Sequence, residues 1–155
     1  MISWLNKQAK NSPYKLAIFG TLVPFWIWCG FIEVLPHLPH VEGMTPIQLF
    51  FAIGRTAYYS FDILVEAPVV EELVFRGLLW WFFSKIFRFN GGGVATLFVT
   101  SIMFALIHSD LAHIMRVMPL SFFLGYLRLK TGSVRPCIVA HMTWNLSCLV
   151  NAMAF

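Results

Sequence analysis

The stretch of residues 68–87, PVVEELVFRGLLWWFFSKIF, decides how the whole chain is interpreted. Apolar residues fill most of it, as in a helix that crosses a lipid bilayer, which takes roughly 20 residues. Two acids and an arginine nevertheless lie inside it, at Glu71, Glu72 and Arg76. Because charged groups within a bilayer are costly, they are rare there unless they are paired or used in chemistry. The stretch therefore predicts both a membrane helix and a functional site.

The composition of the chain also favours a membrane environment. Of its 155 residues, 59% are hydrophobic and only 12% are charged, and the mean hydropathy is +0.74. A soluble domain of this length needs more charge to cover its surface. The basic residues lie near the ends of apolar runs, which indicates membrane topology and excludes a nucleic-acid partner. We expect one all-α domain over residues 1–155, multi-pass in the cell membrane, most simply a bacterial inner membrane.

Breaks in hydrophobicity divide the chain into five or six helices. The apolar segments cover residues 16–35, 47–65, 68–87, 94–108, 113–129 and 136–155. Segment length favours six, so we predict a membrane helix bundle of about six spans with a four-helix catalytic core. The number of spans is five if residues 47–65 are a re-entrant segment or form one helix with residues 68–87. That alternative places all three basic clusters in the cytoplasm, as the positive-inside rule requires.

Helical geometry gives the acids of residues 68–87 different roles. Adjacent helical residues point about 100° apart, because a turn takes 3.6 residues. Glu72 and Arg76 are four residues apart with the acid first, which is the favourable order for an ion pair on one helix face. Glu71 is then left as the unpartnered carboxylate. A carboxylate in a cleft that holds little water is suited to act as a general base.

Two further pairs of residues have the same spacing of four, Phe104 with His108 and His141 with Asn145. This spacing places each pair on one helix face. Histidine relays protons near neutral pH, and asparagine offers a neutral N–H donor to a developing oxyanion. Each residue alone also suits a structural role, such as a hydrogen bond between membrane helices. His113 lies near a helix end, where we expect an ordinary solvated histidine.

The three motifs occur together in one order and spacing. Their residues are Glu71, Glu72 and Arg76, then Phe104 and His108, then His141 and Asn145. This set resembles the signature of the CPBP intramembrane protease family. That family includes CAAX prenyl endopeptidases of the Rce1 type and bacterial proteins linked to bacteriocin processing and immunity. The resemblance covers residues 67–145, and the two segments before it carry no signature.

The resemblance implies an intramembrane endopeptidase that hydrolyses a peptide bond of a membrane-associated protein without a covalent intermediate or a cofactor. Processing of a C-terminal sorting signal or of a CAAX-like motif is the candidate reaction. By position, Glu71 would be the general base and His108 would help to hold and activate the water. His141 and Asn145 would stabilise the oxyanion. The supporting residues would be Glu72, Arg76 and Phe104.

Three alternatives stay open from the sequence. One glutamate and two histidines suffice as ligands for a catalytic zinc ion, but there is no HExxH motif and the histidines lie on different helices, so we expect no metal. A bacteriocin-immunity or scaffolding protein would keep the fold without catalysis. A small transporter would use buried charges as a relay, but the inverted repeat often found in transporters is lacking. The intact motifs favour the enzyme.

The predicted helix boundaries leave one geometric difficulty. Glu71 lies near the start of its predicted helix and His108 near the end of the next, so both lie on one side of the membrane. His141 begins the last helix from the other side. The motifs can meet only at mid-depth, with a short fifth segment, or if the helix of Glu71 begins before Pro68.

Overall fold

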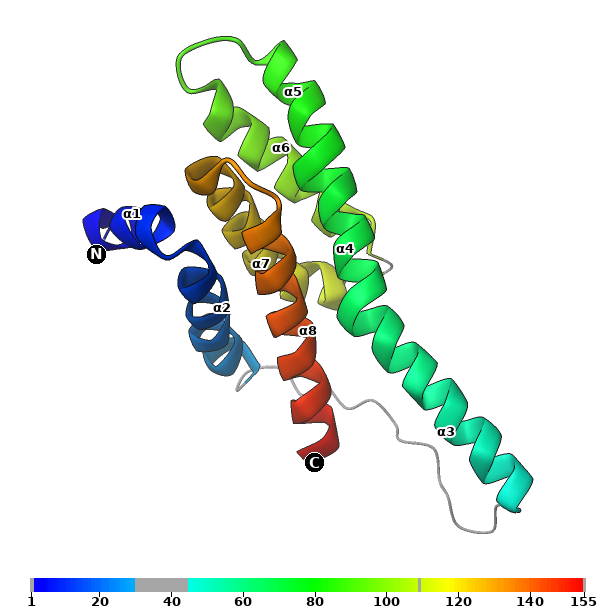
Figure 1. The fold of residues 1–155 in the computed structure, drawn as a ribbon. Helices are drawn as coiled ribbons and strands as arrows, with labels where there is room; N and C mark the ends of the chain where they lie inside the picture. The colour runs from blue at the N-terminus through cyan, green and yellow to red at the C-terminus, as the bar shows by residue number, and fades with distance from the viewer. Residues whose placement is uncertain (1, 30–44, 109, 155) are drawn as a thin grey trace.

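A computed structural model describes residues 2–29, 45–108 and 110–154 of the chain. All regular structure in these ranges is helical (Figure 1). The elements are α1 (Ile2–Asn11), α2 (Pro13–Cys29), α3 (Pro46–Phe61), η1 (Asp62–Glu66), α4 (Ala67–Glu72), η2 (Leu73–Leu79), α5 (Trp80–Ile86), α6 (Gly92–Leu106), α7 (Leu111–Thr131) and α8 (Arg135–Ala154). The all-helical class is thereby confirmed.

Residues 46–86 form one uninterrupted helical run, from α3 through to α5 (Figure 1). Thr45 begins the run as a capping residue, because its side chain accepts a hydrogen bond from the backbone N–H of Gln48. The prediction of two separate helices at residues 47–65 and 68–87 is therefore wrong. The alternative in which these two segments merge into one helix is confirmed. The helix of Glu71 begins well before Pro68, which removes the geometric difficulty.

The run continues through Pro68 because its turns widen on the N-terminal side of the proline. Proline has no N–H to donate to the carbonyl four residues earlier, and its ring crowds that carbonyl. In η1 the chain adopts the wider π-helical turn, in which the N–H of Ala67 bonds to the carbonyl oxygen of Asp62, five residues back. A second π-helical stretch, η2, follows Glu72. The two acids of the first motif thus lie between two irregular turns.

The other predicted segments are recovered more closely. The helices α6, α7 and α8 begin and end within about two residues of the predicted boundaries. Turns that contain glycine set the start of α6, the end of α7 and the start of α8. The segment predicted at residues 16–35 begins earlier, at Pro13, and its residues after 29 lie outside the described ranges. Helix α1 was not predicted.

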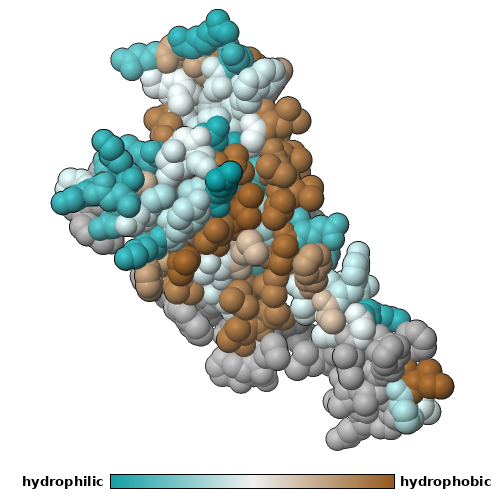
Figure 2. Space-filling model, in the orientation of Figure 1, coloured by the Kyte–Doolittle hydropathy of each residue, from teal (hydrophilic) through white to brown (hydrophobic). Residues whose placement is uncertain are grey.

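Buried apolar residues join α2, α7 and α8 into one core, with Leu16, Leu124 and Trp144 among its members. Hydrophobic residues also cover much of the middle of the surface seen in Figure 2, and hydrophilic residues gather toward its upper and left edges. A bilayer crossing needs a helix that is both long and apolar, and none of the helices in the described ranges meets both conditions. The number of membrane spans stays a prediction.

The helices α6 and α7 pack closely at Gly125. A Cβ atom added there would lie 2.8 Å from Leu97 Cγ and 2.9 Å from Ser101 Oγ. We expect Gly125→Ala to lower the free energy of unfolding by about 1–3 kcal/mol, because the added methyl group forces the helices apart. Gly54→Ala is the matched control, since nothing lies within 4 Å of a Cβ at that position. Denaturant unfolding in detergent measures both, and equal stabilities would contradict the close packing.

Candidate active site

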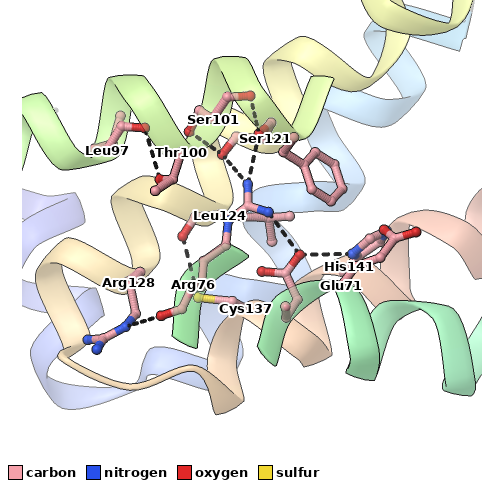
Figure 3. Close-up of polar contacts among 12 residues, drawn as sticks. Glu71, Arg76, Leu97, Thr100, Ser101, Ser121, Leu124, Arg128, Cys137 and His141 are labelled. Carbon is pink, nitrogen blue, oxygen red and sulfur yellow. Dashed lines mark hydrogen bonds and ion pairs between the residues drawn. The ribbon is translucent and has the colours of Figure 1, made fainter. Parts of the chain in front are cut away.

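The ion pair predicted between Glu72 and Arg76 is present and fully buried. Arg76 Nη1 donates to Glu72 Oε1 at 3.2 Å, and both side chains are 0% exposed. Arg76 Nη2 donates to the carbonyl oxygen of Ser121 at 2.9 Å and to its hydroxyl at 2.8 Å (Figure 3). A buried charge is tolerated only where such partners replace water. Arg76 therefore ties the first motif to α7.

His141 lies between the two acids of the first motif. Its Nδ1 is 3.0 Å from Glu72 Oε1, and its Nε2 is 3.8 Å from Glu71 Oε2. An ionised Glu72 can only accept, so Nδ1 carries the proton of this hydrogen bond. Nε2 then faces Glu71, whose side chain is 31% exposed and lies beside His141 in Figure 3. One carboxylate fixes the imidazole from inside the protein, and the other stays open to solvent.

Phe104 brings the second motif to the same place. Its buried ring centroid lies 5.4 Å from the ring of His108 and 5.6 Å from that of His141. The guanidinium carbon of Arg76 lies 4.4 Å from the same centroid, as in a cation–π contact. His108 Nδ1 donates to the carbonyl oxygen of Phe104 at 3.0 Å, so in the neutral ring Nε2 carries the lone pair. His108 and His141 both lie close enough to Glu71 to interact with its charge.

Asn145 lies one turn beyond His141 on α8. Its Nδ2 donates to the backbone carbonyl oxygen of Ile63, in η1, at 2.8 Å. The amide predicted to bind an oxyanion thus holds a peptide carbonyl of its own chain. That contact also joins the middle of α8 to the helical run that carries Glu71.

Several polar residues that support the site were not predicted. Ser101 and Ser121 exchange two hydrogen bonds, because the hydroxyl of each donates to the carbonyl oxygen of the other, at 3.0 and 2.9 Å. Arg128 Nε donates to the carbonyl oxygen of Arg76 at 2.8 Å (Figure 3). The sequence feature that could have identified the two serines is the presence of a hydroxyl group inside an apolar segment. Arg128 lies at the end of an apolar segment, where the sequence indicates a role in membrane topology and does not predict a contact with the site.

Comparison with known proteins identifies the family. The family described as Type II CAAX prenyl endopeptidase Rce1-like matches residues 53–147, which include all three motifs. The chain belongs to this family. The chain is also 25% identical, over 81 residues, to a Bacillus subtilis (strain 168) protein named "Putative membrane peptidase YdiL". Both matches point to a membrane protein of a protease family.

The match to the Bacillus protein is partial. It covers 52% of the Rce1-like chain and 32% of the relative, so the chain accounts for about a third of that relative's length. No solved structure matches the chain. The roles proposed for individual residues of this protein therefore rest on the geometry of the site.

A further histidine of this protein, His113, lies next to the site. The ring centroids of His113 and His108 are 4.5 Å apart, in an edge-to-face arrangement. Asp110 caps α7 by accepting from the N–H of His113 at 2.7 Å, which fixes where His113 enters the helix. The expectation of an ordinary solvated histidine missed this contact. The available signal was the short connection between α6 and α7.

Proposed function

We propose that this protein is an intramembrane endopeptidase that hydrolyses a peptide bond of a membrane-associated protein with a water molecule activated by Glu71. The observation that carries the proposal is the arrangement around His141, which Glu72 holds at 3.0 Å while the more exposed Glu71 faces its other nitrogen at 3.8 Å. A general base must reach solvent while its neighbours stay fixed. Membership of a protease family supports the hydrolysis of a peptide bond.

In this proposal the reaction has two steps and needs no covalent intermediate. The Glu71 carboxylate takes a proton from water, and the water oxygen attacks the carbonyl carbon of the peptide bond. His108 accepts a hydrogen bond from the water through Nε2. Asn145 and a protonated His141 donate to the oxyanion of the tetrahedral intermediate. Glu71 then returns its proton to the leaving nitrogen, and the carbon–nitrogen bond breaks.

Substitution of Asn145 tests the oxyanion step. Because one lost donor to an oxyanion costs about 10²–10³-fold in turnover, we expect that loss in Asn145→Ala and also in Asn145→Asp, which accepts but does not donate. Initial rates measure it, and thermal unfolding separates it from the loss of the bond to Ile63. Asn90→Ala, in an exposed turn, is the matched control. Full turnover of both Asn145 variants would refute the oxyanion role.

The proposed membrane location has support from the surface as well as from the family. Val74, Leu78 and Trp81 are exposed and follow one another at spacings of four and three along the helical run. Phe98 and Ile102 on α6 are exposed in the same way. Because soluble monomers rarely expose such patches, we infer that these residues contact lipid and that the protein is multi-pass. Release of the protein from membranes by alkaline carbonate would contradict this inference.

The substrate class follows from the family as a proposal, with a C-terminal sorting signal or a CAAX-like motif as the recognised feature. Mass spectrometry of membrane proteins from cells that express the wild type or Glu71→Gln would identify it. We expect C-terminally shortened proteins only with the wild type. Identical protein ends in both strains would remove the catalytic proposal and favour a non-catalytic immunity or scaffolding role.

We also propose that hydrolysis proceeds without a metal ion. Within residues 2–29, 45–108 and 110–154, no group of three or more His, Cys, Asp or Glu side chains is arranged to hold a metal. Exhaustive chelation in detergent is expected to leave turnover unchanged, and elemental analysis is expected to find no zinc. Loss of activity on chelation, restored by added zinc, would replace the glutamate mechanism with a zinc-bound water.

A further inference from the structure

The basic residues of this protein gather at one end of the helical bundle. They come from three segments that are distant in the sequence: Lys7, Lys10 and Lys15 near the N-terminus, Lys85 and Arg88 after α5, and Arg128, Lys130 and Arg135 between α7 and α8. These eight residues make up most of the 11 Lys and Arg residues of the chain. We call them the basic end.

Tertiary contacts bring these segments together. The hydroxyl of Tyr126 donates to Asn6 Oδ1 at 3.2 Å, which joins α1 to the last turns of α7. A Cβ on Gly93 would lie 2.9 Å from a methyl carbon of Leu129, so the start of α6 packs against the end of α7. In Figure 1, α1 and the connections α5–α6 and α7–α8 all lie toward the same end of the molecule.

Within the part of the chain that the structure describes, few acids lie near the basic end. Every member except Arg128 is exposed. The described acids lie elsewhere, in η1, in α4 and at the start of α7. The ion pairs that Glu71 and Glu72 form involve no cation of the basic end. Among the described residues, an anionic partner would therefore meet an excess of positive charge.

Helix α1 packs on the protein through its apolar residues and leaves its lysines exposed. Ala9 is buried in the core and Leu5 packs against it, whereas Lys7 and Lys10 are exposed. In Figure 1, α1 runs crosswise to α2, at the upper end of α2. Anionic headgroups can therefore reach the lysines of α1 from outside the protein.

Exposed apolar residues border the basic end and decide the class of its partner. Phe82, Ile86 and Phe89 are exposed beside Lys85 and Arg88. A nucleic acid or an acidic protein would meet the cations but offer no apolar phase to these side chains. A lipid surface offers both, because anionic headgroups lie directly above hydrocarbon.

We propose that the basic end binds the headgroups of anionic phospholipids, with α1 lying in the headgroup layer. The proposal rests on the membrane location proposed above and adds an orientation, since the positive-inside rule then places the basic end on the cytoplasmic side. The hydrogen bond from Arg128 to the carbonyl oxygen of Arg76 joins this surface to the candidate active site. The lipid composition would thus affect a surface that lies next to the buried ion pair of Glu72 and Arg76.

The test uses the full-length protein in nanodiscs of phosphatidylcholine mixed with phosphatidylglycerol, with native mass spectrometry to count the lipids that stay bound. We expect the wild type to retain phosphatidylglycerol several-fold over phosphatidylcholine, and less of it as salt rises. The triple variant Lys7→Gln/Lys10→Gln/Lys15→Gln should lose most of this preference, and the corresponding triple arginine variant should keep it. Lys130→Gln/Arg135→Gln provides a second test should the triple glutamine variant fail to fold.

The matched control is Arg55→Gln/Arg116→Gln, which removes cations outside the basic end. Its lipid preference should equal that of the wild type. A wild type without preference for phosphatidylglycerol, or an equal loss in this control, would overturn the proposal. Glu71→Gln separates the two proposals, because it should bind lipid like the wild type whether or not Glu71 is catalytic.

Discussion

Glu71→Gln is expected to fold like the wild type and to hydrolyse the substrate about 10²–10⁴-fold more slowly, which is the usual contribution of a general base. The amide has the size and shape of the carboxylate but cannot take a proton from water. Because the Glu71 side chain is 31% exposed, the change leaves no buried group without a partner. Turnover should therefore fall while the unfolding transition stays in place.

The control for this experiment is Glu66→Gln. Glu66 is an exposed acid five residues earlier in the same helical run. Its substitution removes one negative charge without touching His141, so we expect a wild-type rate. Initial rates on a substrate identified by mass spectrometry, taken with equal amounts of folded protein, measure both variants. A Glu71→Gln enzyme that retains more than a tenth of the wild-type rate would show that another group activates the water.

Glu72→Gln is expected to act mainly on stability. It leaves the guanidinium of Arg76 buried without its counter-charge, and the loss of one partner from a buried pair costs about 3–5 kcal/mol. The hydrogen bond from His141 Nδ1 also becomes weaker, because a neutral amide accepts less strongly than a carboxylate. We therefore expect a large fall in the free energy of unfolding and, in the protein that still folds, a slower turnover.

Replacement of the whole pair distinguishes charge from packing. The double variant Glu72→Gln/Arg76→Met removes both buried charges and should recover part of the stability that Glu72→Gln loses. Arg88→Gln, an exposed cation, should stay within about 0.5 kcal/mol of the wild type. Denaturant titration of the purified proteins measures all three. A Glu72→Gln protein that loses less than about 1 kcal/mol would mean that water reaches Arg76.

The sequence by itself was enough to determine the local relations of the site. The spacing of Glu72 and Arg76 predicted their ion pair, because side chains four residues apart on a helix are neighbours wherever that helix packs. The turns that contain glycine predicted the start of α6, the end of α7 and the start of α8 for the same local reason. The order of the three motifs indicated the family that the comparison then identified.

Only the tertiary structure decided where the motifs meet. Pro68 looked like the start of a helix, because a proline suits the first turn, and only the π-helical turn before it let the run continue. The positions of His141 between the two acids, of Asn145 on the carbonyl of Ile63, and of His113 beside His108 depend on how separate helices pack. Residue spacing carries no information about such contacts, because the rotation of one helix against another is set by the buried side chains between them.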